Sequence, residues 1–249
     1  MTATSGSTAA DAVRARQRGQ RRLRRQLLRW PVLEVLLAVA FVGLLVFIVT
    51  RDGPPWVDAR VFAASPPGSG PHDVAVVSAV ARFITDLGGP IAWTVGTLVL
   101  AAAVALARHS WLPLRLVALP VGVEAVLVLT LKAAVDRVGP PSSAFAHGGG
   151  FFPSGHTATA LVCTGALAAL VAAWRPEWAR ALRATVLVWS VVMAAALVFV
   201  GYHWLTDVVG SLLLGLLILR LACRPMWAPV RSGDDPPPEY DALRLRENA

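Results

Sequence analysis

The stretch Pro31–Thr50, with the sequence PVLEVLLAVAFVGLLVFIVT, decides the fold class of this chain. Its 20 residues include one charged side chain, Glu34. A helix needs about 17–25 apolar residues to cross the hydrocarbon core of a bilayer, so the stretch predicts a transmembrane helix. It does not read as a cleaved signal peptide. The apolar run is too long, and Val49-Thr50-Arg51 offers no small-residue cleavage site.

Five more apolar stretches of suitable length, or nearly so, follow along the chain. They lie at about Ile91–Ala107, Leu116–Ala134, Thr157–Ala173, Ala184–Val200 and Trp204–Ala222. The chain is 56% hydrophobic and 15% charged, whereas a soluble domain has about 25% charged residues. The composition therefore argues against a cytosolic protein and against a disordered one. We expect an all-α membrane domain over residues 31–222, with six transmembrane helices in one bundle and a disordered tail on either side (1–30 and 223–249).

The positive charge of the chain is concentrated rather than spread. Eight of its 23 basic residues lie in the first 30 positions, directly before the first apolar stretch. With the N-terminus inside, 18 basic residues fall in cytoplasmic segments and five in outer ones. This bias predicts that both termini are cytoplasmic. Nucleic-acid binding would need basic residues across a folded face, so we expect contact with membrane lipid instead.

The connection between the first two spans contains one further predicted element. Between Asp73 and Leu87, the residues Val77, Ala81 and Ile84 belong to an apolar set with helical spacing, which predicts a short amphipathic helix at the outer surface. Elsewhere, Cys163 and Cys223 fall in apolar runs and read as small hydrophobic residues rather than as a disulfide. No metal-ligand spacing is present.

The fourth span opens with Phe151-Phe152-Pro153-Ser154-Gly155-His156-Thr157. Ser154 is a good N-cap residue, and Gly155 permits close approach of a ligand to the backbone. The start of a helix binds anions through its free N–H groups and dipole, and a hydroxyl with an imidazole suits phosphate. A capped helix start without a ligand is the alternative reading of this motif alone.

The sixth span opens with Gly201-Tyr202-His203-Trp204-Leu205-Thr206-Asp207. His203 and Asp207 are four positions apart and share one helix face. A carboxylate beside an imidazole fixes its tautomer and stabilises its cation, which prepares the histidine to attack or to move protons. A purely structural His–Asp pair is the alternative.

Lys132, at the end of the third span, is the chain's one lysine. By itself it could be a snorkelling cation at a helix end. However, the alternation of the spans puts it at the same outer membrane face as the starts of the fourth and sixth spans. Three polar motifs at one depth favour one site.

These motifs resemble those of the type 2 phosphatidic acid phosphatase superfamily, which also includes the vanadium haloperoxidases. The family carries a lysine followed by Arg-Pro, then Pro-Ser-Gly-His, then Ser-Arg followed by histidine and aspartate. The corresponding segments are Lys132 to Pro140, Pro153 to His156, and the segment ending with His203 to Asp207. The resemblance covers about residues 31–222.

Two arginines of the family pattern are missing here. Gly139 stands where the first is expected, and Ala196-Leu197 replaces the Ser-Arg pair. Each would offer phosphate a bidentate fork, so their loss should weaken stabilisation of transition-state charge. Arg137 is a candidate substitute, and His147 lies in the same loop.

The resemblance implies phosphate-ester hydrolysis without metal or cofactor. His203 would attack phosphorus and form a phosphohistidine, Asp207 would orient it, and His156 would protonate the leaving alkoxide. The phosphoryl oxygens would be held by four residues: Lys132, Arg137, Ser154 and Gly155. Because His203 must be neutral and His156 protonated, a bell-shaped pH–rate profile is expected.

The favoured function is hydrolysis of a lipid phosphate or lipid pyrophosphate at the outer face. Phosphatidic acid, phosphatidylglycerol phosphate and polyprenyl pyrophosphate all remain open. The alternatives are a lipid phosphotransferase, an inactive lipid-phosphate binding or transport protein and, more weakly, a haloperoxidase. Glu124, inside the third span, reads as a structural carboxyl or, less favoured, a polar relay.

Overall fold

The computed structural model describes residues 32–64, 74–143 and 149–223. The part of the chain it describes contains no strand. Its six helices long and apolar enough to cross a membrane lie at Val32–Val49, Pro90–Ala107, Leu112–Val135, Gly155–Trp174, Pro176–Val200 and Leu205–Ala222. Each falls on one of the six predicted stretches, which confirms the all-α, six-span fold class. His147 and the two predicted tails, except Cys223, lie outside the described residues.

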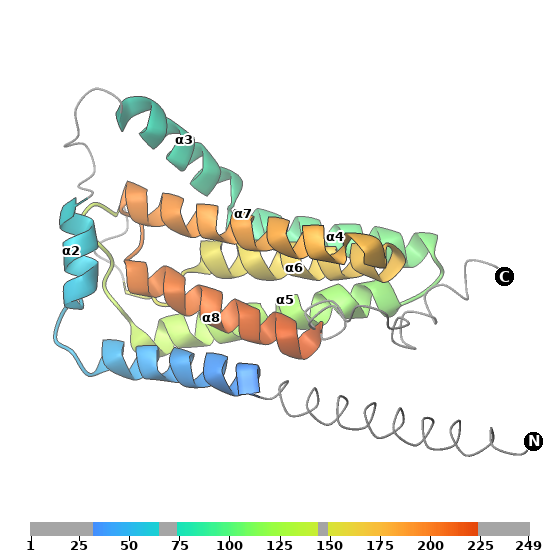
Figure 1. Ribbon diagram of the computed structural model, residues 1–249, viewed down its shortest axis with the longest axis horizontal. Coiled ribbons are helices and arrows are strands. Elements are labelled where there is room, and N and C mark those ends of the chain that lie inside the picture. The colour runs from blue at the N-terminus through green and yellow to red at the C-terminus, as the bar shows by residue number, and fades with distance from the viewer. Residues whose placement is uncertain (1–31, 65–73, 144–148, 224–249) are drawn as a thin grey trace, which may run out of the picture.

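The last five of these helices are α4 (Pro90–Ala107), α5 (Leu112–Val135), α6 (Gly155–Trp174), α7 (Ala179–Val200, after the short 3₁₀ turn Pro176–Trp178) and α8 (Leu205–Ala222). The helix at the centre of the bundle is α6, which packs against α4, α5, α7 and α8 (Figure 1). In the apolar segment of α6, 78% of the residues are buried, against 17% in α4 and in the Val32–Val49 helix. The small residues of α6, among them Ala158, Ala166 and Ala169, let its neighbours approach closely.

The outward faces of the surrounding helices are apolar. Val39 and Val46 of the first span, Val99 of α4, Leu129 of α5 and Val188 of α7 are all exposed. A soluble protein rarely exposes contiguous apolar surface on this scale. These faces fit a hydrocarbon environment.

Two shorter helices lie between the first span and α4. The helix α3 (Val74–Leu87) forms where the amphipathic pattern predicted it. Its Ala81 is buried against Ala196 and Val200 of α7, and Ile84 packs beside them. Val77 and Val80, from the same predicted apolar face, are instead exposed.

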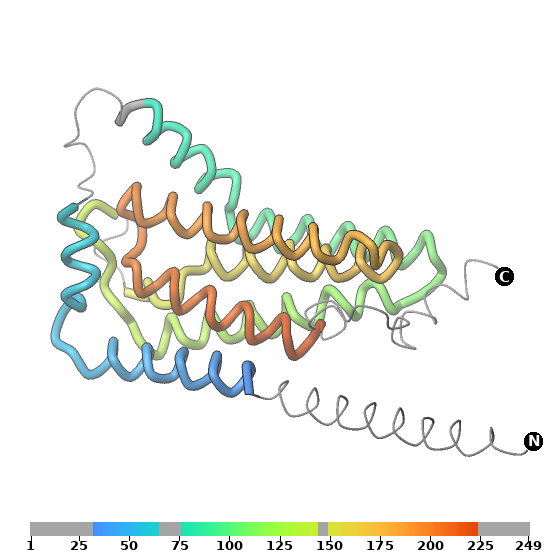
Figure 2. Tube along the Cα trace, viewed as in Figure 1, coloured from blue at the N-terminus to red at the C-terminus, as the bar shows by residue number. Residues whose placement is uncertain are grey.

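The helix α2 (Trp56–Ala64) was not predicted. It contacts α8 and lies across the end of the bundle where α8 begins (Figure 2). Phe62 of α2 meets Trp204 edge to face, with ring centroids 5.7 Å apart. This end of the bundle carries all three polar motifs.

Candidate active site

A sharp turn between α7 and α8 presents His203. Gly201 ends α7 with a φ of 75°, a conformation that glycine adopts without strain. His203 then lies just before α8, with its Nδ1 3.2 Å from Oδ2 of Asp207. If this contact assigns the Nδ1 proton, Nε2 is the unprotonated nitrogen. The predicted His–Asp pair is therefore formed.

Asp207 is fully buried, and each of its two carboxylate oxygens has a polar partner. Oδ2 accepts the backbone N–H of Trp204 at 3.1 Å in addition to facing His203. Oδ1 accepts a hydrogen bond from the guanidinium of Arg137. Both oxygens are thus held, and the carboxylate cannot rotate away from the imidazole without breaking these contacts.

The start of α6 is joined directly to the first turn of α8. Ser154 caps α6 by accepting the N–H of Thr157 at 3.4 Å, and its own N–H donates to the carbonyl of Asp207 at 3.4 Å. The Ser211 hydroxyl lies 2.9 Å from the carbonyl oxygens of both Ser154 and Asp207. The second and third motifs therefore form one hydrogen-bonded unit.

Lys132 and His156 complete the cluster. Lys132, in the last turn of α5, donates a hydrogen bond from Nζ to the carbonyl of Gly150. Its side chain also lies beside Gly155 at the start of α6 and within range of electrostatic interaction with Asp207. His156 is half-buried and close enough to His203 and Lys132 for their charges to interact. The structure thus brings the lysine, both histidines and the aspartate together.

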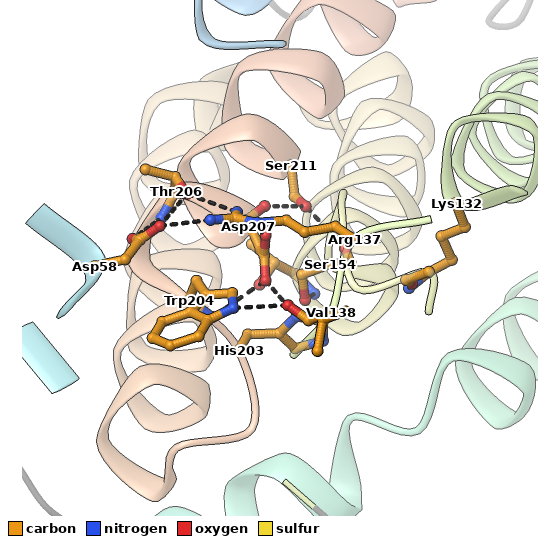
Figure 3. Close-up of polar contacts among 12 residues, drawn as sticks. Asp58, Lys132, Arg137, Val138, Ser154, His203, Trp204, Thr206, Asp207 and Ser211 are labelled. Carbon is orange, nitrogen blue, oxygen red and sulfur yellow. Dashed lines mark hydrogen bonds and ion pairs between the residues drawn. The ribbon is translucent and has the colours of Figure 1, made fainter. Parts of the chain in front are cut away.

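Arg137 lies at this end too, with its guanidinium bonded to both Asp207 and Asp58 (Figure 3). Its Nη1 donates to Asp207 and, at 2.7 Å, to Oγ1 of Thr206. Its Nη2 donates to Oδ2 of Asp58 at 2.7 Å. Both terminal nitrogens are bonded to protein oxygens, and the side chain is only 8% exposed.

Asp58, on α2, is the site residue that sequence analysis missed. It is 1% exposed and was passed over because α2 was read as loop. The available signal was ten residues without proline or glycine between Pro54-Pro55 and Pro66-Pro67, with one carboxylate among mostly apolar neighbours. A buried carboxylate needs charged or hydrogen-bonded partners, and Arg137 and Thr206 supply them.

Other side chains occupy the space at the two positions where the family arginines are missing. A Cβ added at Gly139 would lie 2.4 Å from the ring of Phe151, and that ring packs edge to face on His203 with centroids 5.5 Å apart. Leu197 is fully buried among apolar side chains of α7 and α8. Neither position has room for an arginine without rearrangement.

A cavity of about 390 Å³ reaches the cluster from the side. It is lined by residues of α4, α5 and α6, including Lys132 and Gly155 at one end and Glu124 further along α5. Glu124 is buried and accepts a hydrogen bond from Thr159 at 3.2 Å. Ile91 and Leu129, which also line the cavity, are exposed, so the cavity opens on the apolar outer surface of the bundle.

No group of three histidine, cysteine or acidic side chains suited to a metal ion occurs among the residues described. Cys163 and Cys223 are buried and unpaired.

Comparison with known proteins agrees with the motifs. No curated protein matches the chain. A solved structure, that of a transmembrane PAP2-type phosphatidylglycerolphosphate phosphatase from Bacillus subtilis, is similar with a TM-score of 0.62 and 23% identity, over 76% of this chain and 93% of that one. At that identity the likeness shows the shared fold. The family model of the PAP2 superfamily matches residues 116–231, which begin within α5 and extend past the end of α8. The segment that carries the three motifs thus matches the PAP2 superfamily.

Proposed function

We propose that this chain is an integral membrane phosphatase that hydrolyses a lipid phosphate or lipid pyrophosphate through a phosphohistidine. The observation that carries the proposal is the His203–Asp207 pair beside Lys132, His156 and the start of α6. The match to the PAP2 superfamily supports a phosphatase-type function. A histidine nucleophile needs a carboxylate that orients its ring, whereas a protein that only binds phosphate does not need one.

In the first step, the lone pair of His203 Nε2 attacks phosphorus. The bond from phosphorus to the ester oxygen breaks, and its electron pair leaves with that oxygen. His156 gives the oxygen a proton, so the leaving group departs as an alcohol from a lipid phosphate, or as a lipid monophosphate from a lipid pyrophosphate. Asp207 stabilises the positive charge that develops on the His203 ring.

In the second step, water attacks the phosphohistidine. His156 accepts a proton from the water, whose oxygen bonds to phosphorus. The bond from phosphorus to nitrogen breaks, its electron pair returns to Nε2, and inorganic phosphate is released. Lys132 and the Ser154–Gly155 helix start hold the phosphoryl oxygens in both steps. Direct phosphate contact by Arg137, expected from the sequence, is not part of this proposal, because both terminal nitrogens are bonded to protein oxygens.

The lateral cavity supports a lipid substrate. It joins the exposed apolar surface of α4 and α5 to Lys132 and Gly155, so a headgroup could reach the site while its tail stays among the apolar residues. We also propose that the termini are cytoplasmic and the site lies at the outer face, in agreement with the distribution of basic residues.

The test is phosphate release by detergent-purified protein from a panel of lipid monophosphates and pyrophosphates, with chelator present. His203→Ala should abolish release. The matched control is His109→Asn. Pro90, at the start of α4, borders the cavity, whereas His109 follows the opposite end of that helix. The φ of His109 is 46°, a conformation that asparagine also adopts. The control should release phosphate as the wild type does.

Two other functions would give different results. A folded protein that binds lipid phosphate but releases no phosphate would be an inactive binder. This is the main rival function, because the family arginines are absent at Gly139 and Leu197. Transfer of the phosphoryl group to an added alcohol, in place of water, would identify a phosphotransferase.

A further inference from the structure

Asp58 is the one carboxylate that α2 contributes to the candidate active site. Its Oδ1 accepts the backbone N–H of Thr206 at 2.9 Å, and its Oδ2 accepts the Thr206 hydroxyl at 2.6 Å. The same Oδ2 accepts Nη2 of Arg137 at 2.7 Å. Asp58 therefore ties the outer connection to the first turn of α8 and to the segment after α5.

Arg137 links this carboxylate to the His–Asp pair. Its guanidinium bonds Asp58 on one side and Asp207 on the other, and Asp207 in turn faces Nδ1 of His203 (Figure 3). The four side chains form an unbroken series, Asp58–Arg137–Asp207–His203. The side chains of both aspartates are 0% exposed and that of Arg137 is 8% exposed. Water therefore screens these charges little.

The charges of this series do not cancel behind the histidine. With both carboxylates ionised, two negative groups flank one positive group, which leaves a net charge of −1 beside His203. Without the charge of Asp58, Arg137 would neutralise Asp207. The ring of His203 would then lose the negative field that stabilises the positive charge formed as its nitrogen bonds to phosphorus.

We infer that Asp58 is a positioning residue that holds Arg137 against Asp207 and keeps a net negative charge behind His203. This inference rests on the proposed function. It gives Arg137 a role through Asp207, in place of direct contact with phosphate. It also explains why both terminal nitrogens of Arg137 are bonded to protein oxygens.

The first comparison is between Asp58→Asn and Asp52→Asn. Asp52 is an exposed carboxylate six positions earlier in the same connection. Asp58→Asn should lower kcat about 10- to 100-fold, the size of effect expected from a misplaced reacting group. The KM for the lipid and the inhibition constant for inorganic phosphate should stay within about twofold of wild type. Asp52→Asn should change none of these quantities.

The second comparison separates positioning from folding. Arg137→Gln leaves two buried carboxylates without a cation, so it should lower the melting temperature as well as kcat. The double variant Asp58→Asn with Arg137→Gln removes one charge of each sign, so it restores the net charge of −1 behind His203. It should regain much of the lost melting temperature and part of the kcat that Asp58→Asn loses. A double variant that regains the melting temperature while its kcat stays at or below that of Asp58→Asn would show that the charge behind His203 does not set the rate, and would overturn the inference.

The remaining outcomes are equally decisive. If Arg137→Gln raises the inhibition constant for inorganic phosphate as strongly as Lys132→Ala does, Arg137 is a phosphate ligand and the inference is wrong. A fully active Asp58→Asn overturns the inference and leaves the proposed function standing. Wild-type protein that releases no phosphate overturns the proposed function, and the inference with it.

Discussion

Asp207 is the residue on which the geometry of the site converges, since it contacts His203, Trp204 and Arg137. Asp207→Asn keeps the shape but removes the charge that holds the imidazole tautomer. We expect kcat to fall by about 10²- to 10⁴-fold. Arg137 keeps its partner Asp58 in this variant, so the protein should still fold. Phosphate-release kinetics and a thermal melt in detergent measure both effects.

The control for this substitution is Asp52→Asn, because Asp52 is an exposed carboxylate in the connection before α2. It should behave as wild type. An Asp207→Asn variant with wild-type kcat would show that His203 does not depend on its carboxylate.

His156 has a different task, which the pH dependence should reveal. As the group that protonates the leaving oxygen, it must be protonated, so its loss of a proton gives the alkaline limb of the rate profile. His156→Gln should remove that limb and lower kcat by about 10²- to 10⁴-fold. The measurement is kcat against pH for both proteins. An unchanged alkaline limb would assign it to another group.

At the scale of helices, the site depends on how closely α8 approaches the segment that leads into α6. A Cβ added at Gly210 of α8 would lie 2.5 Å from the ring of Phe152. Gly210→Ala should therefore cost about 1–3 kcal/mol of stability by overpacking. It should also loosen the contacts between Ser154 and Asp207, with a fall in kcat. Thermal unfolding in detergent, with activity on the same sample, tests this.

Gly96→Ala on α4 is the matched control, because its added Cβ meets nothing within 4 Å. Alanine is also the better helix former, so this variant should be as stable as wild type or more so. Equal melting temperatures for the two variants would mean that the contact between Gly210 and Phe152 does not limit the packing.

At the scale of the whole molecule, the orientation in the membrane can be tested with introduced thiols. Cys163 and Cys223 are both buried, so a membrane-impermeant thiol reagent should react mainly with new exposed cysteines. Asp52 and Glu177 are exposed at opposite ends of the bundle. Asp52→Cys should be labelled on intact cells, and Glu177→Cys only after permeabilisation. The reverse pattern would place the site in the cytoplasm.

The sequence was most informative where one physical requirement dominates. Apolar length alone predicted all six spans, and the alternation of spans predicted that Lys132, Ser154 and His203 would meet at one end. The partner of Arg137 could not be predicted, because Asp58 lies 79 positions away on a helix too short to show a hydrophobic period. The contact between Phe151 and Gly139 likewise depends on tertiary packing that no local pattern reveals.

The central claim is that His203 becomes phosphorylated, and trapping the phosphoenzyme tests it most directly. Lipid substrate carrying a radioactive phosphoryl group would be mixed with the protein and quenched within one turnover. We predict an acid-labile, base-stable label on a peptide containing His203, absent from His203→Ala and present in His109→Asn. Phosphate release by wild type without any such label, or a label that persists in His203→Ala, would contradict the account.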